Sequence, residues 1–272
     1  MAELSGGGRA DLPALLALAT QLAQDASALL IDGLTRARSS VTTKSSSTDM
    51  VTEMDRAAEA LIADGIRSAR PDDGIVGEEG TADVGTSGVR WVIDPIDGTT
   101  NYLYGLSGFG VSIAAEVDGE AVAGVVADPI RGDLYTATKG SGANLNGSRI
   151  RVSALSDLGG ALIGTGFSYD PSRRRRQAAV LMQVIPEIRD IRRFGAASLD
   201  LCLVASGRLD GYYERGLSRW DYAAGALIAS EAGARLGDLD GAAPSSEFML
   251  ASAVGLFEPL RDLLDRAGAR DA

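Results

Sequence analysis

The sequence predicts a layered α+β fold, and three observations support this prediction. Two helical patterns open the chain, a group of short β-like runs follows them, and the second half mixes helices and strands without strict alternation. A barrel of repeating strand–helix units would require that alternation. The 272 residues, 45% hydrophobic and 23% charged, are enough to bury a large core.

The first two elements are expected to be helices. From Leu12 onward, apolar residues recur at the spacing of one helical face. They are Leu12, Leu15, Leu16, Ala19, Leu22, Ala23, Ala26, Leu29 and Leu30. The Ser- and Thr-rich residues 39–49 predict a loop. We expect the second helix to begin near Thr52, whose hydroxyl can cap it, and to end at Pro71.

Short apolar runs separated by Gly, Asp and Pro predict strands in the rest of the chain. In the first half, the predicted strands cover residues 75–76, 89–93, 111–117, 122–127 and 134–137. In the second half, strands are predicted at 162–163 and 209–213. Helices are predicted at 177–185, at 198–205, from Asp221 to near Gly233, and at 256–266.

The charge balance argues against a protein whose main role is to bind nucleic acid. Lys and Arg number 26 against 37 Asp and Glu, which gives a formal net charge of −11. Nucleic-acid binding normally requires the opposite sign. An acidic protein can still bind a small phosphate when Mg²⁺ lies between its carboxylates and the ligand.

The counts of cysteine and histidine exclude several kinds of chemistry. Cys202 is the single cysteine and lies in an apolar run, so the chain has no internal disulfide and no zinc–cysteine cluster, which fits a reducing compartment. The chain has no histidine, which removes the Ser-His-Asp triad and histidine general bases. Catalysis would have to use carboxylates, hydroxyls, lysine or backbone groups.

We expect a cytoplasmic protein with no membrane segment, because no signal-peptide pattern and no run of eighteen apolar residues occurs. Residues 1–10, with three consecutive glycines, are expected to be a disordered leader. Residues 11–272 are expected to form a single two-lobed domain, with lobes at about 11–150 and 151–272.

The segment Asp94-Pro95-Ile96-Asp97-Gly98-Thr99 ends a predicted strand and is the strongest candidate for a site. Pro95 fixes the backbone so that Asp94 and Asp97 can face one point, where they would repel each other unless a cation lay between them. If a helix begins at Gly98, its N–H groups can bind phosphate. The alternative is structural, since Pro and Asp-Gly are common turn residues.

Other acidic positions are weaker candidates when taken alone. Gly77-Glu78-Glu79-Gly80 is typical of a solvated turn. Asp221 can be the N-cap of its helix, and Asp55, in the first turn of the second helix, can interact with the helix dipole.

In their order and in the identity of their residues, these segments resemble the inositol monophosphatase family from about residue 12 to residue 260. The resemblance rests on Gly77-Glu78-Glu79, on the segment from Asp94 to Thr99, and on Trp220-Asp221. It implies a five-layered αβαβα sandwich, usually a homodimer. It also implies hydrolysis of myo-inositol monophosphate, or of a closely similar polyol or sugar phosphate, by a metal-activated water, with sensitivity to lithium.

The resemblance assigns a role to each matching residue. The ligands of two or three Mg²⁺ ions per subunit would be Glu78, Asp94, the carbonyl of Ile96, Asp97 and Asp221. The catalytic residues would be Glu78 and Thr99, which position the attacking water, with Asp55 orienting Thr99. The substrate would contact Asp97, Gly98, Thr99, Gly195, Ala196, Ala197 and Glu214, under a lid loop that carries Lys44.

Alternatives remain open at this point. Related enzymes act on fructose 1,6-bisphosphate, histidinol phosphate or 3′-phosphoadenosine 5′-phosphate. A relative that has lost catalysis would instead bind RNA or a protein in a regulatory role, and the run Arg173-Arg174-Arg175-Arg176 is the sequence feature that favours this. The ordinary interpretation of the run is a solvated start of a helix.

Overall fold

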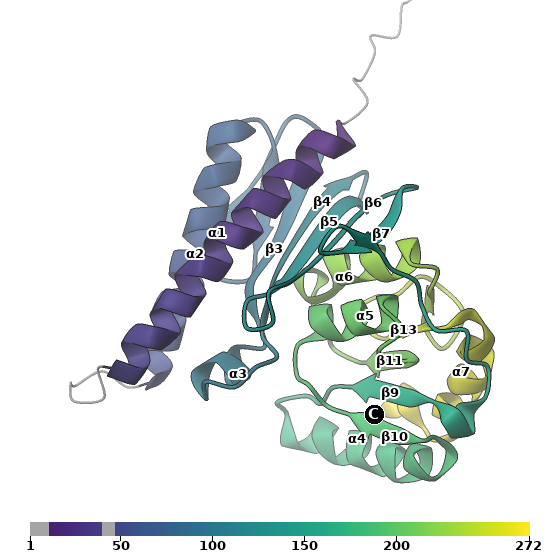
Figure 1. The fold of residues 1–272 in the computed structure, drawn as a ribbon. Helices are drawn as coiled ribbons and strands as arrows, with labels where there is room; N and C mark the ends of the chain where they lie inside the picture. The colour runs from purple at the N-terminus through teal and green to yellow at the C-terminus, as the bar shows by residue number, and fades with distance from the viewer. Residues whose placement is uncertain (1–10, 40–46) are drawn as a thin grey trace, which may run out of the picture.

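The computed structural model describes residues 11–39 and 47–272, and it has a layered α+β architecture (Figure 1). In this part of the chain, two helices, an eight-stranded sheet, two helices, a five-stranded sheet and two helices follow one another in space. Each interface between neighbouring layers holds its own cluster of buried apolar side chains. The expected leader, residues 1–10, and the expected lid residue Lys44 lie outside the described residues.

The outer helices α1 (Leu12–Ser39) and α2 (Ser47–Ala69) cover one face of the first sheet. Its strand order is β2-β1-β3-β4-β5-β6-β7-β8, with β1 parallel to β3 and the other neighbours antiparallel. The strands are β1 (Gly74–Gly77), β2 (Ala82–Asp83), β3 (Val89–Asp97), β4 (Gly110–Val117), β5 (Glu120–Asp128), β6 (Asp133–Thr138), β7 (Gly142–Leu145) and β8 (Ser148–Arg149). The short helix α3 (Thr99–Leu103) follows β3 directly.

The helix α1 is long and apolar enough between Leu12 and Leu34 to cross a membrane, judged by length and composition alone. In the fold, however, one face of α1 packs against α2, β4 and β5. Leu15, Leu22 and Leu30 on that face are buried in the core that α1 shares with the first sheet. The apolar residues of α1 therefore have a role in the interior of the protein.

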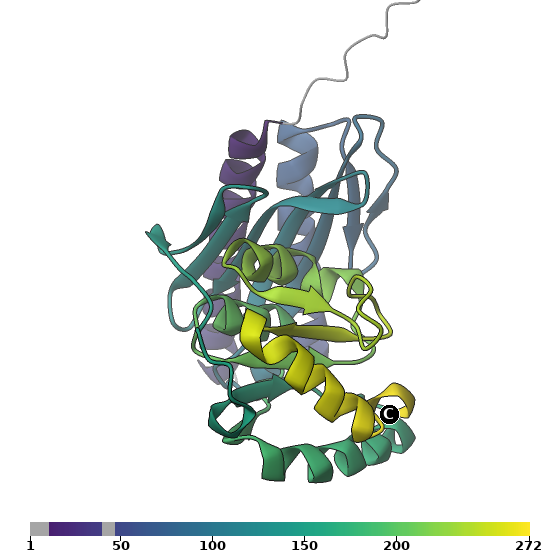
Figure 2. The same cartoon turned by 90° about the vertical axis from the view of Figure 1, so that its right-hand side faces the viewer.

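The second half of the chain supplies the remaining layers. Helices α5 (Ala197–Ala205) and α6 (Arg219–Glu231) lie between the two sheets. The second sheet has the order β10-β9-β11-β13-β12 and consists of β9 (Leu162–Thr165), β10 (Asp190–Arg192), β11 (Gly211–Glu214), β12 (Arg235–Gly237) and β13 (Met249–Ser252). The outer helices α4 (Pro171–Val184) and α7 (Phe257–Arg266) complete the stack, and Figure 2 shows α7, in yellow, across the outer side of this sheet. Short 3₁₀ turns lie at Leu158–Gly160, Ile185–Glu187, Val254–Leu256 and Ala269–Asp271.

Several predicted helix boundaries are wrong, because a helix can begin before its first buried apolar residue. Helix α1 runs to Ser39 and α2 begins at Ser47, so Thr52 lies inside α2 and does not cap it. Helix α4 begins at Pro171, well before residue 177, because four arginines in its first turns carry no apolar periodicity. Its start was nevertheless marked, since Asp170 caps it and Pro171 occupies the first position.

The sequence also missed the short edge strands β2, β8, β10 and β12 and the inner strands β7 and β13. They are two to four residues long. A segment of this length is too short to display the apolar–polar alternation by which strands are recognised.

Candidate functional site

A cavity of about 330 Å³ opens where the end of β3 meets the start of α6 and the segments around β10 and β11. Its volume lies in the range of small-molecule sites. The structure brings ten of the predicted site residues to its wall: Glu78, Asp94, Ile96, Asp97, Gly98, Thr99, Gly195, Ala197, Glu214 and Asp221. Asp55 and Ala196 are buried and are not part of the wall.

A bulge at the end of β3 places the two central carboxylates. Asp94 pairs with Ser112 on β4, whereas Asp97 pairs with Gly110, so the register shifts between them. Pro95 lies in this irregular stretch, where its missing N–H costs no ladder bond. The N–H of Ile96 donates to Asp94 Oδ1 at 3.1 Å, which fixes the orientation of that carboxylate.

The turn after the bulge depends on Gly98. Its φ of 90° is left-handed, and a β-carbon at this position would lie 2.8 Å from the carbonyl oxygen of Gly108. The next residue, Thr99, begins α3, and its hydroxyl donates to the carbonyl of Ile96 at 3.0 Å. This turn therefore presents the Ile96 carbonyl and the Gly98 and Thr99 backbone close together at the cavity wall.

Glu78 is positioned by a residue that the sequence analysis missed. Glu59 on α2 is buried and accepts hydrogen bonds from the N–H groups of Glu79 at 2.8 Å and Thr81 at 2.9 Å. A β-carbon on Gly77 would clash with the Glu59 carboxylate, so a glycine is required beside it. The sequence did contain one indication of this role, since Glu59 lies one helical turn after Asp55 on the same face of α2.

Asp221 is not the N-cap of its helix, as one interpretation of the sequence held. Helix α6 begins at Arg219 with Ser218 as its N-cap. Asp221 is the third helical residue, and its Oδ2 accepts a hydrogen bond from the Ser218 N–H at 2.6 Å. The carboxylate thus bends back over the start of α6 while still lining the cavity.

The carboxylates around the cavity strongly perturb one another. Burial, followed by repulsion from Asp97, Glu78 and Asp221, holds the pKa of Asp94 well above its usual value. Burial, followed by repulsion from Asp221, raises the pKa of Asp97 to about 8. Burial is also the main cause that raises the pKa of Asp221 to about 7 and that raises the pKa of Glu78. Burial and mutual repulsion therefore disfavour the simultaneous ionisation of these carboxylates.

The donor set fits a hard divalent cation. In residues 11–39 and 47–272, no lysine or arginine forms an ion pair with Glu78, Asp94, Asp97 or Asp221. Among the described residues, no group of three or more Asp, Glu, His or Cys side chains is gathered closely enough in this structure to hold a metal ion by itself. Open oxygen sets of this kind suit Mg²⁺, which keeps water and substrate phosphate in its shell.

Asp55 lies about two turns into α2 and not in its first turn, so the helix dipole does not explain it. It is buried, and its Oδ1 has no hydrogen-bond partner. Burial, followed by repulsion from Glu79 and Glu78, raises its pKa to about 8. It is therefore a second buried carboxyl group close to the Glu78 loop.

The opposite wall comes from the second half of the chain. Glu214 at the end of β11 accepts a hydrogen bond from the Tyr212 hydroxyl at 2.5 Å. The segment from Gly195 leads into α5, whose first turn donates the N–H of Ser198 to Asp97 Oδ2 at 2.7 Å. The Asn101 amide on α3 ties this wall to the first half of the chain, donating to the carbonyls of Gly108 at 2.6 Å and Phe194 at 2.7 Å. The site is thus assembled from both halves of the chain.

The sequence analysis did not single out Tyr212, Ser198, Asn101 or Arg193, although all four hold or line this wall. Asp200 was missed as well, and it is buried in the first turn of α5 with an unpartnered Oδ1. None of these residues is unusual in a linear pattern, because their partners lie far away in the sequence.

The chain thus combines a layered α+β fold with a carboxylate-lined cavity, a donor set typical of metal-dependent hydrolases. The inositol monophosphatase family model matches residues 11–269, and the chain belongs to this family. Membership implies a phosphatase, of a family that is generally metal-dependent.

Individual relatives agree with this assignment. An inositol-1-monophosphatase of Mycobacterium leprae is 46% identical over 237 residues, which cover 83% of this chain and 81% of that protein. The Nus factor SuhB of Pasteurella multocida is 44% identical over 229 residues, covering 84% and 86%. Among solved structures, Mycobacterium tuberculosis SuhB superposes with a TM-score of 0.84 at 40% identity, covering 97% of this chain and all of that one.

Proposed function

We propose that this protein is a Mg²⁺-dependent phosphomonoesterase that hydrolyses myo-inositol monophosphate or a closely similar polyol or sugar phosphate. The observation that supports this most is the group of four cavity carboxylates without an ion-pair partner in the described chain, in a cavity that Glu214 also lines. A phosphate group can bind beside such carboxylates when cations bridge it to them.

The carboxylates and one backbone carbonyl of the cavity would bind the metal ions. Glu78, Asp94, the Ile96 carbonyl, Asp97 and Asp221 would hold two or three Mg²⁺ ions. When bound, these ions would neutralise phosphate charge and make water a usable nucleophile near neutral pH.

The remaining residues bind and orient the reactants. The backbone of Gly98 and Thr99 would bind the phosphate, and Glu78 with the Thr99 hydroxyl would position the attacking water. Asp55 would orient Thr99, whose hydroxyl donates to the Ile96 carbonyl in this structure. Gly195, Ala196 and Ala197 would shape the polyol pocket, and Glu214 would accept hydrogen bonds from substrate hydroxyls.

Further parts of the proposal concern the whole protein. We propose a cytoplasmic homodimer of two-lobed subunits, inhibited by lithium, in which a loop carrying Lys44 covers the site. Fructose 1,6-bisphosphate, histidinol phosphate and 3′-phosphoadenosine 5′-phosphate remain alternative substrates.

The test is phosphate release from inositol 1-phosphate and from these three alternatives, with and without Mg²⁺, for the wild type and Asp94→Asn. We expect Mg²⁺-dependent turnover that falls at least about a hundredfold in the variant, because a ligand of the metal is lost. Asp128→Asn is a matched control, since Asp128 is also buried but does not line the cavity. Thermal melts of both variants would show that the fold is kept.

A non-catalytic regulatory role is the second candidate. It is favoured by a relative that bears the name Nus factor and by the exposed side chains of Arg174, Arg175 and Arg176 on α4. If none of the four phosphates is hydrolysed at any Mg²⁺ concentration, the phosphatase proposal fails and this second candidate takes its place.

A further inference from the structure

Two arginines line the cavity without a hydrogen-bond or ion-pair partner in the described chain, although the charge of Arg193 acts at longer range on Glu214 and Asp200. Arg173 lies in the first turn of α4, and Arg193 follows the end of β10. Within residues 11–39 and 47–272, neither guanidinium forms a hydrogen bond or an ion pair. Each guanidinium carries five donors, so two complete sets of charged donors remain available in one concave site.

Glycines in the cavity wall make room for both guanidinium groups. Gly195 and Gly216 both line the cavity and have left-handed φ values of 90° and 85°. A β-carbon on Gly195 would clash with Arg193 Nη1, and one on Gly216 would lie 2.8 Å from Arg173 Nη1. The two guanidinium groups therefore lie against the backbone of the cavity wall, with Arg173 half-buried and Arg193 exposed.

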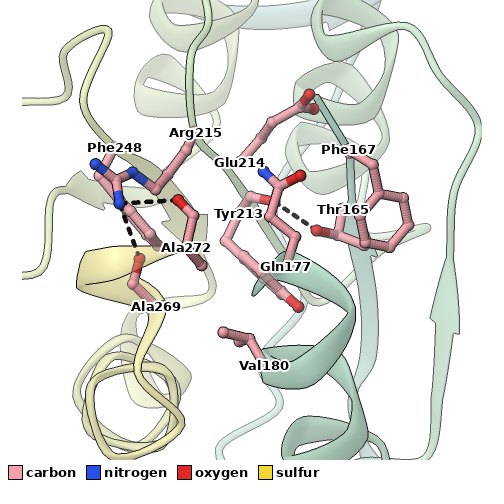
Figure 3. A pocket seen from close by; sticks show the side chains of 11 residues that line it. Thr165, Phe167, Gln177, Val180, Tyr213, Glu214, Arg215, Phe248, Ala269 and Ala272 are labelled. Carbon is pink, nitrogen blue, oxygen red and sulfur yellow. Dashed lines mark hydrogen bonds between the residues drawn. The ribbon is translucent and has the colours of Figure 1, made fainter. Parts of the chain in front are cut away.

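A third arginine of the cavity, Arg215, differs in that its guanidinium group forms hydrogen bonds and an ion pair within the protein. It donates to the carbonyls of Ala269 at 3.4 Å and Ala272 at 2.9 Å, as Figure 3 shows, and it pairs with Glu247 at 3.2 Å. Its donors hold the end of the chain against β11, so its role is structural. Arg173 and Arg193 have no such role in the described structure.

The acidic and basic residues of the cavity come from different segments of the chain. The carboxylates come from β3, the Glu78 loop and α6, whereas the two arginines come from α4 and the segment after β10, beside Glu214. In a chain with a net charge of −11, free cationic groups in a cavity favour an anionic ligand. In the proposed function, the phosphate to be cleaved binds at the carboxylates and does not need the arginines.

We propose that Arg173 and Arg193 form a second anion-binding subsite in this cavity. The preferred substrate is then a phosphorylated polyol that carries a second anionic group, phosphate or carboxylate, at the end away from the ester that is cleaved. This inference rests on the proposed function and names its substrate class more closely.

The test compares substrates that differ in the second anionic group. Inositol 1-phosphate against inositol 1,4-bisphosphate tests a second phosphate, and glycerol 2-phosphate against 2-phosphoglycerate tests a carboxylate. We measure kcat/KM for each in Mg²⁺ with the wild type, Arg173→Ala, Arg193→Ala and the double variant. Arg174→Ala is the matched control, because Arg174 lies on the same turn of α4 but is exposed and does not line the cavity.

We expect the wild type to favour, in at least one pair, the compound with the second anionic group by about tenfold, a typical gain for hydrogen bonds to a charged group. This ratio should fall toward one in the double variant and stay unchanged in Arg174→Ala. A wild-type ratio near one for both pairs overturns the proposal. So does an equal loss for both members of a pair, because the arginines would then act on the cleaved phosphate or on Glu214.

Calorimetry separates this inference from the proposed function. If no compound is hydrolysed, the phosphatase proposal fails, and the subsite is judged by the binding of inositol 1,4-bisphosphate and inositol 1-phosphate in Mg²⁺. Tighter binding of the bisphosphate that is lost in the double variant supports the subsite. Equal binding of the two compounds refutes it.

Discussion

At the scale of single residues, the site depends on side chains that do not reach the cavity. Glu59 is the clearest case, because its two carboxylate oxygens accept the N–H groups of Glu79 and Thr81 and so hold the loop that carries Glu78. A glutamine in its place has one acceptor oxygen, and its amide nitrogen would face a backbone donor.

We therefore expect Glu59→Gln to raise the Mg²⁺ concentration for half-maximal activity about tenfold, as is typical for groups that orient metal ligands. The free energy of unfolding should fall by about 1–2 kcal/mol, because a buried N–H loses its acceptor. Mg²⁺ titrations of activity and urea unfolding measure the two effects. Glu53→Gln on the exposed side of the same helix is the control. An unchanged Mg²⁺ requirement would show that Glu59 does not position the site.

Sequence motifs located the residues that line the cavity better than those that support them. The segment from Asp94 to Thr99 could be recognised because its chemistry is local, and it does line the cavity. Glu59 and Asn101 act on backbone groups 7 to 93 residues away, so no spacing rule could identify them. Their roles appear only once the fold brings these segments together.

At the scale of elements, the passage from β3 to α3 sets the geometry of the site. The bulge separates Asp94 from Asp97, and Gly98 then reverses the backbone in a left-handed conformation. A β-carbon on Gly98 would meet the backbone of Gly108, which is itself tied to Asn101. The turn therefore cannot accept a larger residue without moving one of its neighbours.

Gly98→Ala should lower the free energy of unfolding by about 1–3 kcal/mol through strain. It should also lower kcat/KM about a hundredfold through displacement of the turn. The informative comparison is Gly119→Ala in the hairpin between β4 and β5. Gly119 has a φ of 79° but nothing within 4 Å of a β-carbon. That control should lose about 1–2 kcal/mol of stability from its φ alone and keep full activity.

If the two glycine variants lose equal activity, the close approach to Gly108 plays no part in catalysis. Urea unfolding and steady-state kinetics of both variants decide this.

The passage from β3 to α3 also shows which secondary-structure elements could be predicted from the sequence. A helix at this point was considered only as a condition for phosphate binding, and a short one does form, beginning at Thr99. The full length of β3 was not, because Pro95 interrupts the pattern that predicts a strand.

At the scale of the whole molecule, the layers bring acidic groups from distant parts of the chain into one buried region. The first sheet supplies Asp94 and Asp97, and α6 supplies Asp221. The layered class could be predicted from the order of the elements, since helices bracket the β-like runs in both halves. The convergence of the carboxylates could not be derived from periodicity, because it depends on how the two sheets stack around α5 and α6.

This convergence predicts how stability depends on pH when Mg²⁺ is absent. Asp97 and Asp221 have folded pKa values of about 8 and 7, far above the ordinary value of 3.8. At any pH between 3.8 and these folded pKa values, the folded protein holds protons that the unfolded chain has released. The stability that these two groups contribute is therefore complete at low pH and is lost as pH rises from the ordinary value of 3.8 to the folded values of about 7 and 8, by about 1.4 kcal/mol per pH unit for each extra proton held.

We expect urea unfolding in EDTA to show a falling free energy of unfolding between pH 5 and pH 8.5. With millimolar Mg²⁺ the decline should largely disappear, because the metal replaces the protons, and the gain from Mg²⁺ should be larger at pH 8.5 than at pH 5. At a hundred times its dissociation constant, a bound ligand adds about 2.7 kcal/mol. Sodium chloride at matched ionic strength is the control for simple screening.

The composition of the chain makes this experiment unusually easy to interpret. The sequence has no histidine, so the side chain that normally titrates between pH 5 and pH 8 is absent. Hydrogen bonds lower the pKa values of the surface groups Asp170 and Asp190, which therefore finish titrating below this range. A decline in stability across this range would therefore be assigned to the buried carboxylates. Stability that rises with pH in EDTA would instead mean that these side chains are ionised and separated in the folded protein, and the proposed metal site would lose its electrostatic basis.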